Sequence, residues 1–336
     1  MPHPIPDDSG MRDFIALNDR YFPPDVTGLT MADQRARYDG YCAALLAPLP
    51  KGITFTDIHI TAENPGRSIP ARHYRPTRPQ NLGTTILYMH GGGFIVGDLE
   101  SHHDICAEMS LATGTDLVSI DYRLAPEHVH PAQIDDTIAA YSQLLRSGQR
   151  IVVGGDSAGG NLAAALCLHC KSAGLPMPLG QFLIYPGLGG DATRGSYVEM
   201  ADAPLLTTQD VLYYGRMRSG GVERGNVADP SQSPLTATDF SGLPPAVIVS
   251  ADIDPLRDDS RDYRDALHKA GVKALWRNEP QLLHGYLRGR NLSARAGASF
   301  GWICRMVGKL AQGKPLYAAG RAAPEPDTFG SFSAMP

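Results

Sequence analysis

The stretch IVVGGDSAGG at residues 151–160 decides the fold of this 336-residue chain. It begins with an apolar, β-branched run at 151–155 that predicts a buried strand, and it leads into residues 158–173, which predict a helix. Ser157 lies in the turn between them, inside a G-x-S-x-G pattern. Small residues two positions before and after a serine let the chain turn sharply and lift the hydroxyl above the sheet. Ser157 is therefore the candidate nucleophile, with the amino-terminal dipole of the following helix beneath developing negative charge.

Strand-like and helix-like segments alternate on both sides of this stretch. Short apolar runs predict eight strands, at residues 53–60, 68–74, 84–89, 117–122, 151–155, 181–185, 246–251 and 272–276. Amphipathic segments predict helices between the later strands, at residues 102–113, 131–146, 158–173 and 257–270. This order predicts an α/β fold: a mostly parallel sheet with helices on both faces, and an antiparallel edge where the first two strands follow each other directly.

Two regions break the alternation and predict a helical cap. Residues 1–50 contain helix-like segments at 11–21 and 31–46 before any strand, and residues 187–241 form a long excursion rich in Gly, Pro and Asp. We expect both to cover the carboxyl ends of the strands. The domain organisation is then 1–50 as amino-terminal cap helices, 51–312 as the catalytic domain with the cap insertion at about 187–241, and 313–336 as a flexible tail.

A glycine-rich loop follows the predicted strand at 84–89. Its sequence is HGGGF at residues 90–94, and consecutive glycines let backbone amides point into open space, where they can donate to an oxygen that gains charge. The alternative is a phosphate-binding glycine loop, but the Gly-Lys-Ser/Thr that such a loop carries is missing. The loop therefore favours acyl transfer.

The base and the acid are expected in the order serine, acid, histidine. His284 follows the last predicted strand beside Gly285, whereas His268 lies in a helix and is expected to face solvent, so His284 is the candidate base. Two candidate acids, Asp252 and Asp254, follow the predicted strand at 246–251. The following proline favours Asp254, and the residues alone leave Asp252 open.

Composition excludes several classes of protein. The formal net charge is −5, the pI is about 6.1, and no basic stripe could neutralise a nucleic acid backbone. No secretory signal and no run of 18 apolar residues is present, so no membrane partner is expected. The cysteines are odd in number and scattered, which favours reduced thiols in the cytoplasm, and the C-x-x-C at 167–170 is interpreted as a pair of helix thiols.

Two further groups of polar residues are expected to be structural. His102 and His103 lack a third ligand at a suitable spacing, so no metal site is predicted and these histidines are expected to face solvent or pack. The block DYRLAPE at 121–127 is expected to hold its own loop by pairing its arginine with its carboxylates.

Five blocks in order resemble the hormone-sensitive-lipase-like family of α/β-hydrolase esterases, which includes bacterial acetyl esterases and carboxylesterases. The resemblance covers residues 53–306 and is densest in these blocks: HGGGFIVGD (90–98), DYRLAPE (121–127), GDSAGGNL (155–162), DPLRD (254–258) and HGY (284–286). It implies the α/β-hydrolase fold with a helical cap. It also implies Asp254 as the acid and the amides of Gly92, Gly93 and Ala158 as the oxyanion hole, with His90 and Gly91 supporting the loop. Gln281 and Tyr286 depart from the family pattern, and we expect both to border the active site and affect substrate range.

The resemblance implies a carboxylesterase that needs no cofactor and acts on small esters with short to medium acyl chains. Ser157, His284 and Asp254 would form its catalytic triad. Two alternatives are an amidase or peptidase on the same scaffold and a non-catalytic small-molecule receptor, and the presence of His284 argues against the receptor. The exposed last strand could also pair edge to edge in a homodimer.

Overall fold

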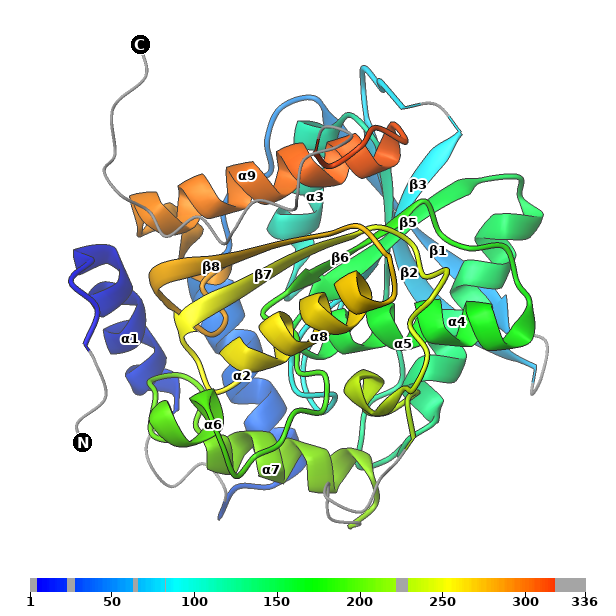
Figure 1. Ribbon diagram of the computed structural model, residues 1–336. Coiled ribbons are helices and arrows are strands. Elements are labelled where there is room, and N and C mark those ends of the chain that lie inside the picture. Colours follow the sequence, from blue (N-terminus) through cyan, green and yellow to red (C-terminus); the bar gives the residue numbers. More distant parts are fainter. Residues whose placement is uncertain (1–4, 23–27, 63–65, 82, 222–228, 318–336) are drawn as a thin grey trace.

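The computed structural model describes residues 5–22, 28–62, 66–81, 83–221 and 229–317, and the predicted tail lies mostly outside them. One eight-stranded sheet of order β1-β2-β4-β3-β5-β6-β7-β8 forms the centre (Figure 1). All pairs from β4 to β8 are parallel, whereas β1–β2 and β2–β4 are antiparallel. The predicted antiparallel edge and the mostly parallel sheet are therefore confirmed.

The strands lie close to the predicted positions. Their bounds are β1 Ile53–Ala62, β2 Arg67–Pro76, β3 Thr84–Met89, β4 Asp116–Ile120, β5 Arg150–Asp156, β6 Gly180–Ile184, β7 Ala246–Ile253 and β8 Ala274–Leu283. The last strand differs most, because it runs seven residues beyond the predicted end at Trp276 and leads directly into His284. A register irregularity between β7 and β8 accompanies this extension.

Helices cover both faces of the sheet. The α-helices are α1 Ser9–Tyr21, α2 Met31–Leu45, α3 His103–Thr113, α4 Ala132–Arg146, α5 Ala158–Ala173, α6 Ser196–Glu199, α7 Thr208–Arg218, α8 Arg257–Lys269 and α9 Ala294–Ala311, with 3-10 turns η3 Pro234–Thr236 and η4 Arg288–Asn291. In Figure 1, α3 and α9 lie on one side and α4, α5 and α8 on the other. Helix α9 was not predicted. Each face has its own apolar core, since Phe182 packs with α9 on one side while Leu183 packs with α5 on the other.

The two regions that break the alternation do contain helices. Residues before β1 form α1 and α2, and the excursion after β6 contains α6, α7 and η3. Helix α7 begins with a capping box, in which Thr207 and Asp210 each bind the other's backbone amide. Helices α2 and α7 meet where the Gln34 side chain donates to the Tyr213 hydroxyl over 3.2 Å. The two segments thus contact each other although 179 residues separate them in sequence.

Two structural expectations are wrong. Arg123 does not pair with a carboxylate of its own block: it binds Asp136 of α4, and Glu127 of the same block binds Arg35 of α2. His268 does not face solvent freely, because its Nε2 atom lies 2.8 Å from the Ala274 carbonyl oxygen. In both cases the partner comes from another element, which no local pattern reveals.

The histidines at the start of α3 and the cysteines are packed in the interior, as expected. His102 and His103 are buried, and the five cysteines are free and buried. No group of three or more metal-ligating side chains occurs in the part of the chain that the structure describes. None of the described helices is long and apolar enough to cross a membrane.

Candidate active site

Ser157 occupies the tight turn between β5 and α5. Its φ angle is +52°, in a region that residues other than glycine rarely adopt. Side chains could not replace the flanking glycines, because a Cβ at Gly155 or Gly159 would collide with the carbonyl of Met89 on the neighbouring strand. The turn therefore requires the glycines of the G-x-S-x-G pattern and holds the Ser157 side chain at the carboxyl end of the sheet.

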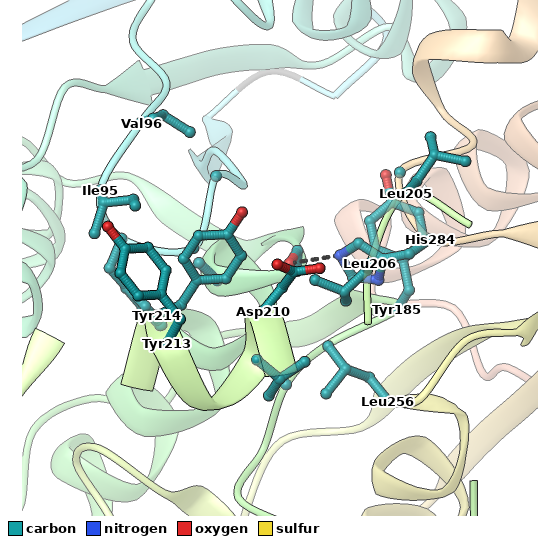
Figure 2. A pocket seen from close by; sticks show the side chains of 18 of the residues that line it. Ile95, Val96, Tyr185, Leu205, Leu206, Asp210, Tyr213, Tyr214, Leu256 and His284 are labelled. Carbon is teal, nitrogen blue, oxygen red and sulfur yellow. Dashed lines mark hydrogen bonds between the residues drawn. The ribbon is translucent and has the colours of Figure 1, made fainter. Parts of the chain in front are cut away.

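Ser157, His284 and Asp254 form a hydrogen-bonded chain. The Oγ atom of Ser157 lies 2.9 Å from Nε2 of His284, and Nδ1 of His284 lies 2.8 Å from Oδ2 of Asp254 (Figure 2 shows the position of His284). Asp254 is fully buried, and its other oxygen accepts the Leu256 amide over 2.8 Å. Asp252, the competing acid, instead accepts a hydrogen bond from Asn278. The imidazole thus lies between a hydroxyl and a fixed carboxylate.

The glycine loop after β3 borders the same cavity as Ser157. Gly92 and Gly93 have φ angles of +123° and +59°, and the Gly92 carbonyl accepts the amides of Ile95 and Val96. No acceptor among the described residues binds the amide of Gly92 or Gly93. Ala158 is the first residue of α5, where amides have no partner within the helix. Gly92, Gly93, Ser157 and Ala158 all line one cavity.

His90 and Gly91, at the start of this loop, contact neighbouring residues through ring stacking and hydrogen bonds. The His90 ring stacks on Tyr122 with centroids 4.3 Å apart, and the Tyr122 hydroxyl donates to the His90 carbonyl over 2.7 Å. Nδ1 of His90 lies 2.7 Å from the Gly91 carbonyl oxygen. Burial, with the nearby His102, lowers the pKa of His90 to about 4, so the ring is neutral near pH 7.

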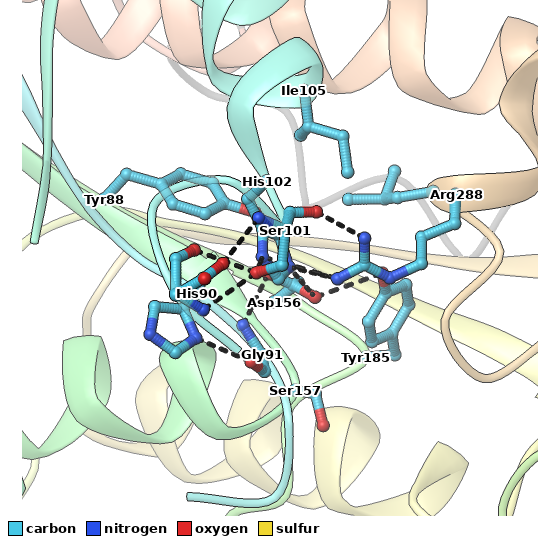
Figure 3. A network of polar contacts seen from close by, with 12 residues as sticks. Tyr88, His90, Gly91, Ser101, His102, Ile105, Asp156, Ser157, Tyr185 and Arg288 are labelled. Atoms are coloured by element: carbon cyan, nitrogen blue, oxygen red, sulfur yellow. Dashed lines mark hydrogen bonds and ion pairs between the residues drawn. The ribbon is translucent and has the colours of Figure 1, made fainter. Parts of the chain in front are cut away.

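Asp156 joins the glycine loop to the turn at Ser157 (Figure 3). Its Oδ1 atom accepts the Gly91 amide over 3.0 Å and the Tyr88 hydroxyl over 2.7 Å, and Nε2 of His102 lies 3.2 Å from it. Burial acts to raise the pKa of Asp156, but His102, the Tyr88 hydroxyl and the Arg288 charge outweigh it, so the pKa lies below its ordinary value. The carboxylate is therefore ionised and bridges the two loops.

Arg288 extends this network toward the cap. It donates to the Ser101 carbonyl and, over 2.7 Å, to the Tyr38 hydroxyl of α2. Neither Asp156 nor Arg288 was selected as a functional residue from the sequence. The position of Asp156 within the GDSAG pattern at 155–159 could have indicated its role, whereas no local sequence pattern indicates a role for Arg288.

A cavity of about 860 Å³ opens above Ser157. Figure 2 shows its apolar wall, with Leu205 and Tyr185 beside His284, Leu256 below, and Tyr213 and Tyr214 of α7 opposite. The α1 and α2 segments complete the lining, so both proposed cap regions contribute to it.

The expectation for Gln281 and Tyr286 is wrong, because neither lines this cavity. Tyr286 is fully buried and its hydroxyl lies 2.7 Å from that of Ser299. Gln281 points toward the amino terminus, where its side chain accepts the Asp7 amide. Its φ angle is +65°, which explains why a glycine would suit this position.

Comparisons with known proteins agree with this geometry. A family model described as an alpha/beta hydrolase fold matches residues 86–288. The chain is 38% identical over 239 residues to esterase LipI of Mycobacterium tuberculosis, covering 68% of this chain and 74% of the relative. It is 37% identical over 303 residues to carboxylic ester hydrolase LipN of the same organism, covering 85% and 78%. A solved esterase of the bacterial hormone-sensitive lipase family matches with a TM-score of 0.81 and 26% identity, covering 91% of this chain and 99% of that one.

Proposed function

The chain belongs to the hormone-sensitive-lipase-like family of α/β-hydrolase esterases and is a carboxylesterase, and from this premise we propose that Ser157, His284 and Asp254 are its catalytic triad. The observation that carries the proposal is the hydrogen-bonded chain from the Ser157 hydroxyl through His284 to the buried Asp254. The proposed roles follow from the chemistry of each group.

Acylation is the first half of the reaction. His284 removes the Ser157 proton through Nε2 while Oγ attacks the ester carbonyl carbon. The carbonyl oxygen becomes an oxyanion, which accepts hydrogen bonds from the amides of Gly92, Gly93 and Ala158. Asp254 keeps Nδ1 of the imidazole oriented and stabilises the imidazolium. His284 then returns the proton to the departing alcohol, leaving the acyl group on Ser157.

Deacylation repeats these steps with water. His284 takes a proton from the water molecule as its oxygen attacks the acyl carbon, and the same amides hold the second oxyanion. When the intermediate collapses, the proton returns to Ser157 and the carboxylic acid leaves. These side chains account for each proton transfer, so the proposal includes no cofactor.

The substrates are esters with short to medium acyl chains, as the resemblance to this family implies. The cavity volume of about 860 Å³ lies within the roughly 300–1,000 Å³ found for small-molecule sites, and side chains of α2 and α7 help to line it. We expect an optimum at or below about eight acyl carbons. Rates for p-nitrophenyl esters from acetate to palmitate test this, and a preference for palmitate would contradict it.

Hydrolysis of p-nitrophenyl butyrate tests the triad. Ser157→Ala should lower kcat by about 10⁴-fold or more, because the covalent intermediate can no longer form. Ser233→Ala is a matched control, since Ser233 lines the same cavity away from the hydrogen-bonded chain. Equal activity of the Ser157→Ala protein and the parent would refute the assignment. An inactive parent would favour a receptor, and faster hydrolysis of the matched anilide would favour an amidase.

The remaining proposals concern assembly and location. Strand β8 ends the sheet and, within the part of the chain that the structure describes, has a β-strand partner on one side only. We propose that two copies pair along it in a homodimer. Mass measurement in solution tests this, and a monomer at micromolar concentration would contradict it.

Free buried thiols support a reducing, cytoplasmic location, which fractionation of the producing cells would test.

A further inference from the structure

One side of the cavity is a cluster of aromatic rings. It consists of Phe22 after α1, Tyr38 and Tyr41 of α2, and Tyr185 after β6, all of which line the cavity and belong to one apolar core. The cluster starts at the proposed base, because the Tyr185 ring lies 4.8 Å from the His284 ring. It continues to Tyr41, whose ring lies 5.6 Å from that of Phe22 and 6.4 Å from that of Tyr38.

The hydroxyl groups of this cluster differ in their partners. The Tyr38 hydroxyl accepts a hydrogen bond from Arg288 over 2.7 Å, and the Tyr185 hydroxyl donates to Asp156 over 3.4 Å. Tyr41 is only 4% exposed, and no described residue is hydrogen-bonded to its hydroxyl. Fully enclosed polar atoms without a partner occur elsewhere, for example at Ser119 and Ser260, but the Tyr41 hydroxyl is not among them. Tyr41 lines the cavity, so a ligand in that space is the partner that its incompletely enclosed hydroxyl could bind.

A largely buried hydroxyl that no protein group satisfies gains a hydrogen bond when a ligand supplies the acceptor. The charge nearby indicates which kind of partner fits. Burial raises the pKa of Tyr41 above its usual range, and the Arg288 charge opposes that rise. Arg288, which also lines the cavity, therefore places positive charge near the hydroxyl, and this charge favours an oxygen acceptor over a cation as the partner. The cavity lining also contains the carboxylates of Asp19 and Asp156, and the negative charge of Asp156 offsets the positive charge of Arg288. An anionic ligand would therefore gain little electrostatic attraction there.

We propose that the Tyr41 hydroxyl is a specificity-determining donor that binds an uncharged oxygen acceptor, such as a ketone carbonyl, in one half of the ester substrate. The aromatic rings hold the apolar part of that half, and the hydroxyl binds its oxygen. This proposal rests on the esterase function proposed above. It adds that the enzyme prefers oxygen-bearing chains to plain hydrocarbon chains of equal length.

Matched esters test the proposal. Ethyl hexanoate is compared with ethyl 3-, 4- and 5-oxohexanoate, and hexyl acetate with its 3-, 4- and 5-oxo derivatives, by titrating the released acid. We expect at least one oxo ester to have a kcat/KM above that of its hydrocarbon counterpart. Tyr41→Phe keeps the ring and removes only the hydroxyl, so it should lower the ratio of these two kcat/KM values by about 3- to 10-fold, the usual effect of one neutral hydrogen bond.

Tyr21→Phe is the matched control. The Tyr21 ring lies 6.1 Å from that of Tyr41 but does not line the cavity, so this variant should keep the parent's ratio. Because the Tyr41 hydroxyl has no described protein partner, Tyr41→Phe should also unfold at a temperature no lower than the parent. The proposal is overturned if no oxo ester is preferred in either series, or if Tyr41→Phe leaves the ratio unchanged while both hydrocarbon esters are hydrolysed. A parent that hydrolyses none of these esters overturns the esterase function as well.

Discussion

Asp156, next to the proposed nucleophile, links two parts of the site with one carboxylate. It accepts the Gly91 amide of the glycine loop and the Tyr88 hydroxyl, while its own backbone ends β5 directly before Ser157. Hydrogen bonds to an ionised acceptor are about twice as strong as neutral ones. The charge of Asp156 therefore helps to fix the distance between the proposed nucleophile and the proposed oxyanion donors.

Asp156→Asn should lower kcat by about 10-fold and change KM less, because the neutral amide holds Gly91 more weakly while the cavity walls remain. Steady-state kinetics with p-nitrophenyl butyrate give both constants. Tyr88→Phe is the control, since it removes another hydrogen bond from the same carboxylate but leaves the Gly91 contact. If Tyr88→Phe lowers kcat as much as Asp156→Asn does, the effect is general loosening and the positioning role is wrong.

Asp121, which directly follows β4, has a raised pKa, whereas the pKa of Asp156 is lowered. Burial, together with the nearby Asp98, raises the pKa of Asp121 to about 6. Protonation is therefore easier in the folded protein than in the unfolded chain, whose aspartates titrate near 3.9. The stability that this provides is complete below about pH 4 and is lost as the pH rises through 6.

Asp121→Asn should raise the free energy of unfolding at pH 7.5 by about 1 to 2 kcal/mol, after allowance for partial solvent exposure, and by less at pH 5. Chemical denaturation at both values measures this difference. Asp135→Asn replaces an exposed aspartate of α4 and should show no such change with pH. An Asp121→Asn gain that is equal at pH 5 and 7.5 would show that the carboxyl does not titrate as stated.

At the scale of elements, α2 connects three parts of the site through residues on adjacent turns. Gln34 contacts Tyr213 of α7, Arg35 donates to the carbonyls of Ile95 and Ala125, and Tyr38 accepts from Arg288. The Ile95 carbonyl lies in the loop that follows the proposed oxyanion glycines. Helix α2 therefore supports this loop as well as lining the cavity.

Arg35→Ala should lower kcat/KM by about 10-fold, because it frees the Ile95 and Ala125 carbonyls and the Glu127 carboxylate together. Arg35→Lys should recover part of this loss, since an ammonium keeps the charge but not the planar fork that binds several acceptors. Arg37→Ala is the control on the same helix, where the side chain binds the Tyr21 carbonyl at the end of α1. Equal losses in Arg35→Ala and Arg37→Ala would mean that any weakening of α2 has this effect.

The sequence predicted the elements well where a local pattern determines them. The strand, turn and helix around Ser157 follow from β-branched residues and glycines within a short window, and each lies where expected. The end of β8 was missed, because Gln281 adopts a positive φ and the alternation of apolar residues fades before His284. The roles of Gln281 and Tyr286 were wrong for the same reason, since side-chain direction after such an irregularity is not encoded in residue spacing.

Contacts between distant segments lay beyond sequence reasoning. Tyr38 and Arg288 are separated by 250 positions, and Arg35 and Glu127 by 92. No periodicity relates such residues, and each pair forms only because the sheet order brings their loops to the same edge. The choice between Asp252 and Asp254 was likewise left open by the residues, whereas the positions of His284 and Asn278 distinguish them structurally.

At the scale of the whole molecule, several histidines are buried or half-buried, and burial favours their neutral form. Burial is the largest cause of a lowered pKa in each of His73, His90, His103, His130 and His169. In the unfolded chain a histidine titrates near 6.5. Between about pH 6.5 and the lower folded-state pKa, the unfolded chain therefore binds more protons than the folded protein, and stability falls as the pH falls.

For His90, whose pKa is lowered to about 4, this loss reaches about 2 kcal/mol at pH 5. Asp121 acts in the opposite direction over the same range, so we expect the several histidines together to outweigh it. The unfolding temperature should fall between pH 7 and pH 5, and calorimetry in buffers of different ionisation enthalpy should detect proton uptake on unfolding. His90→Asn should flatten this dependence, whatever its effect on overall stability, whereas His59→Asn on the exposed edge strand should not. Proton release on unfolding at pH 5.5 would show that carboxyl groups, not buried histidines, govern the acid stability of this fold.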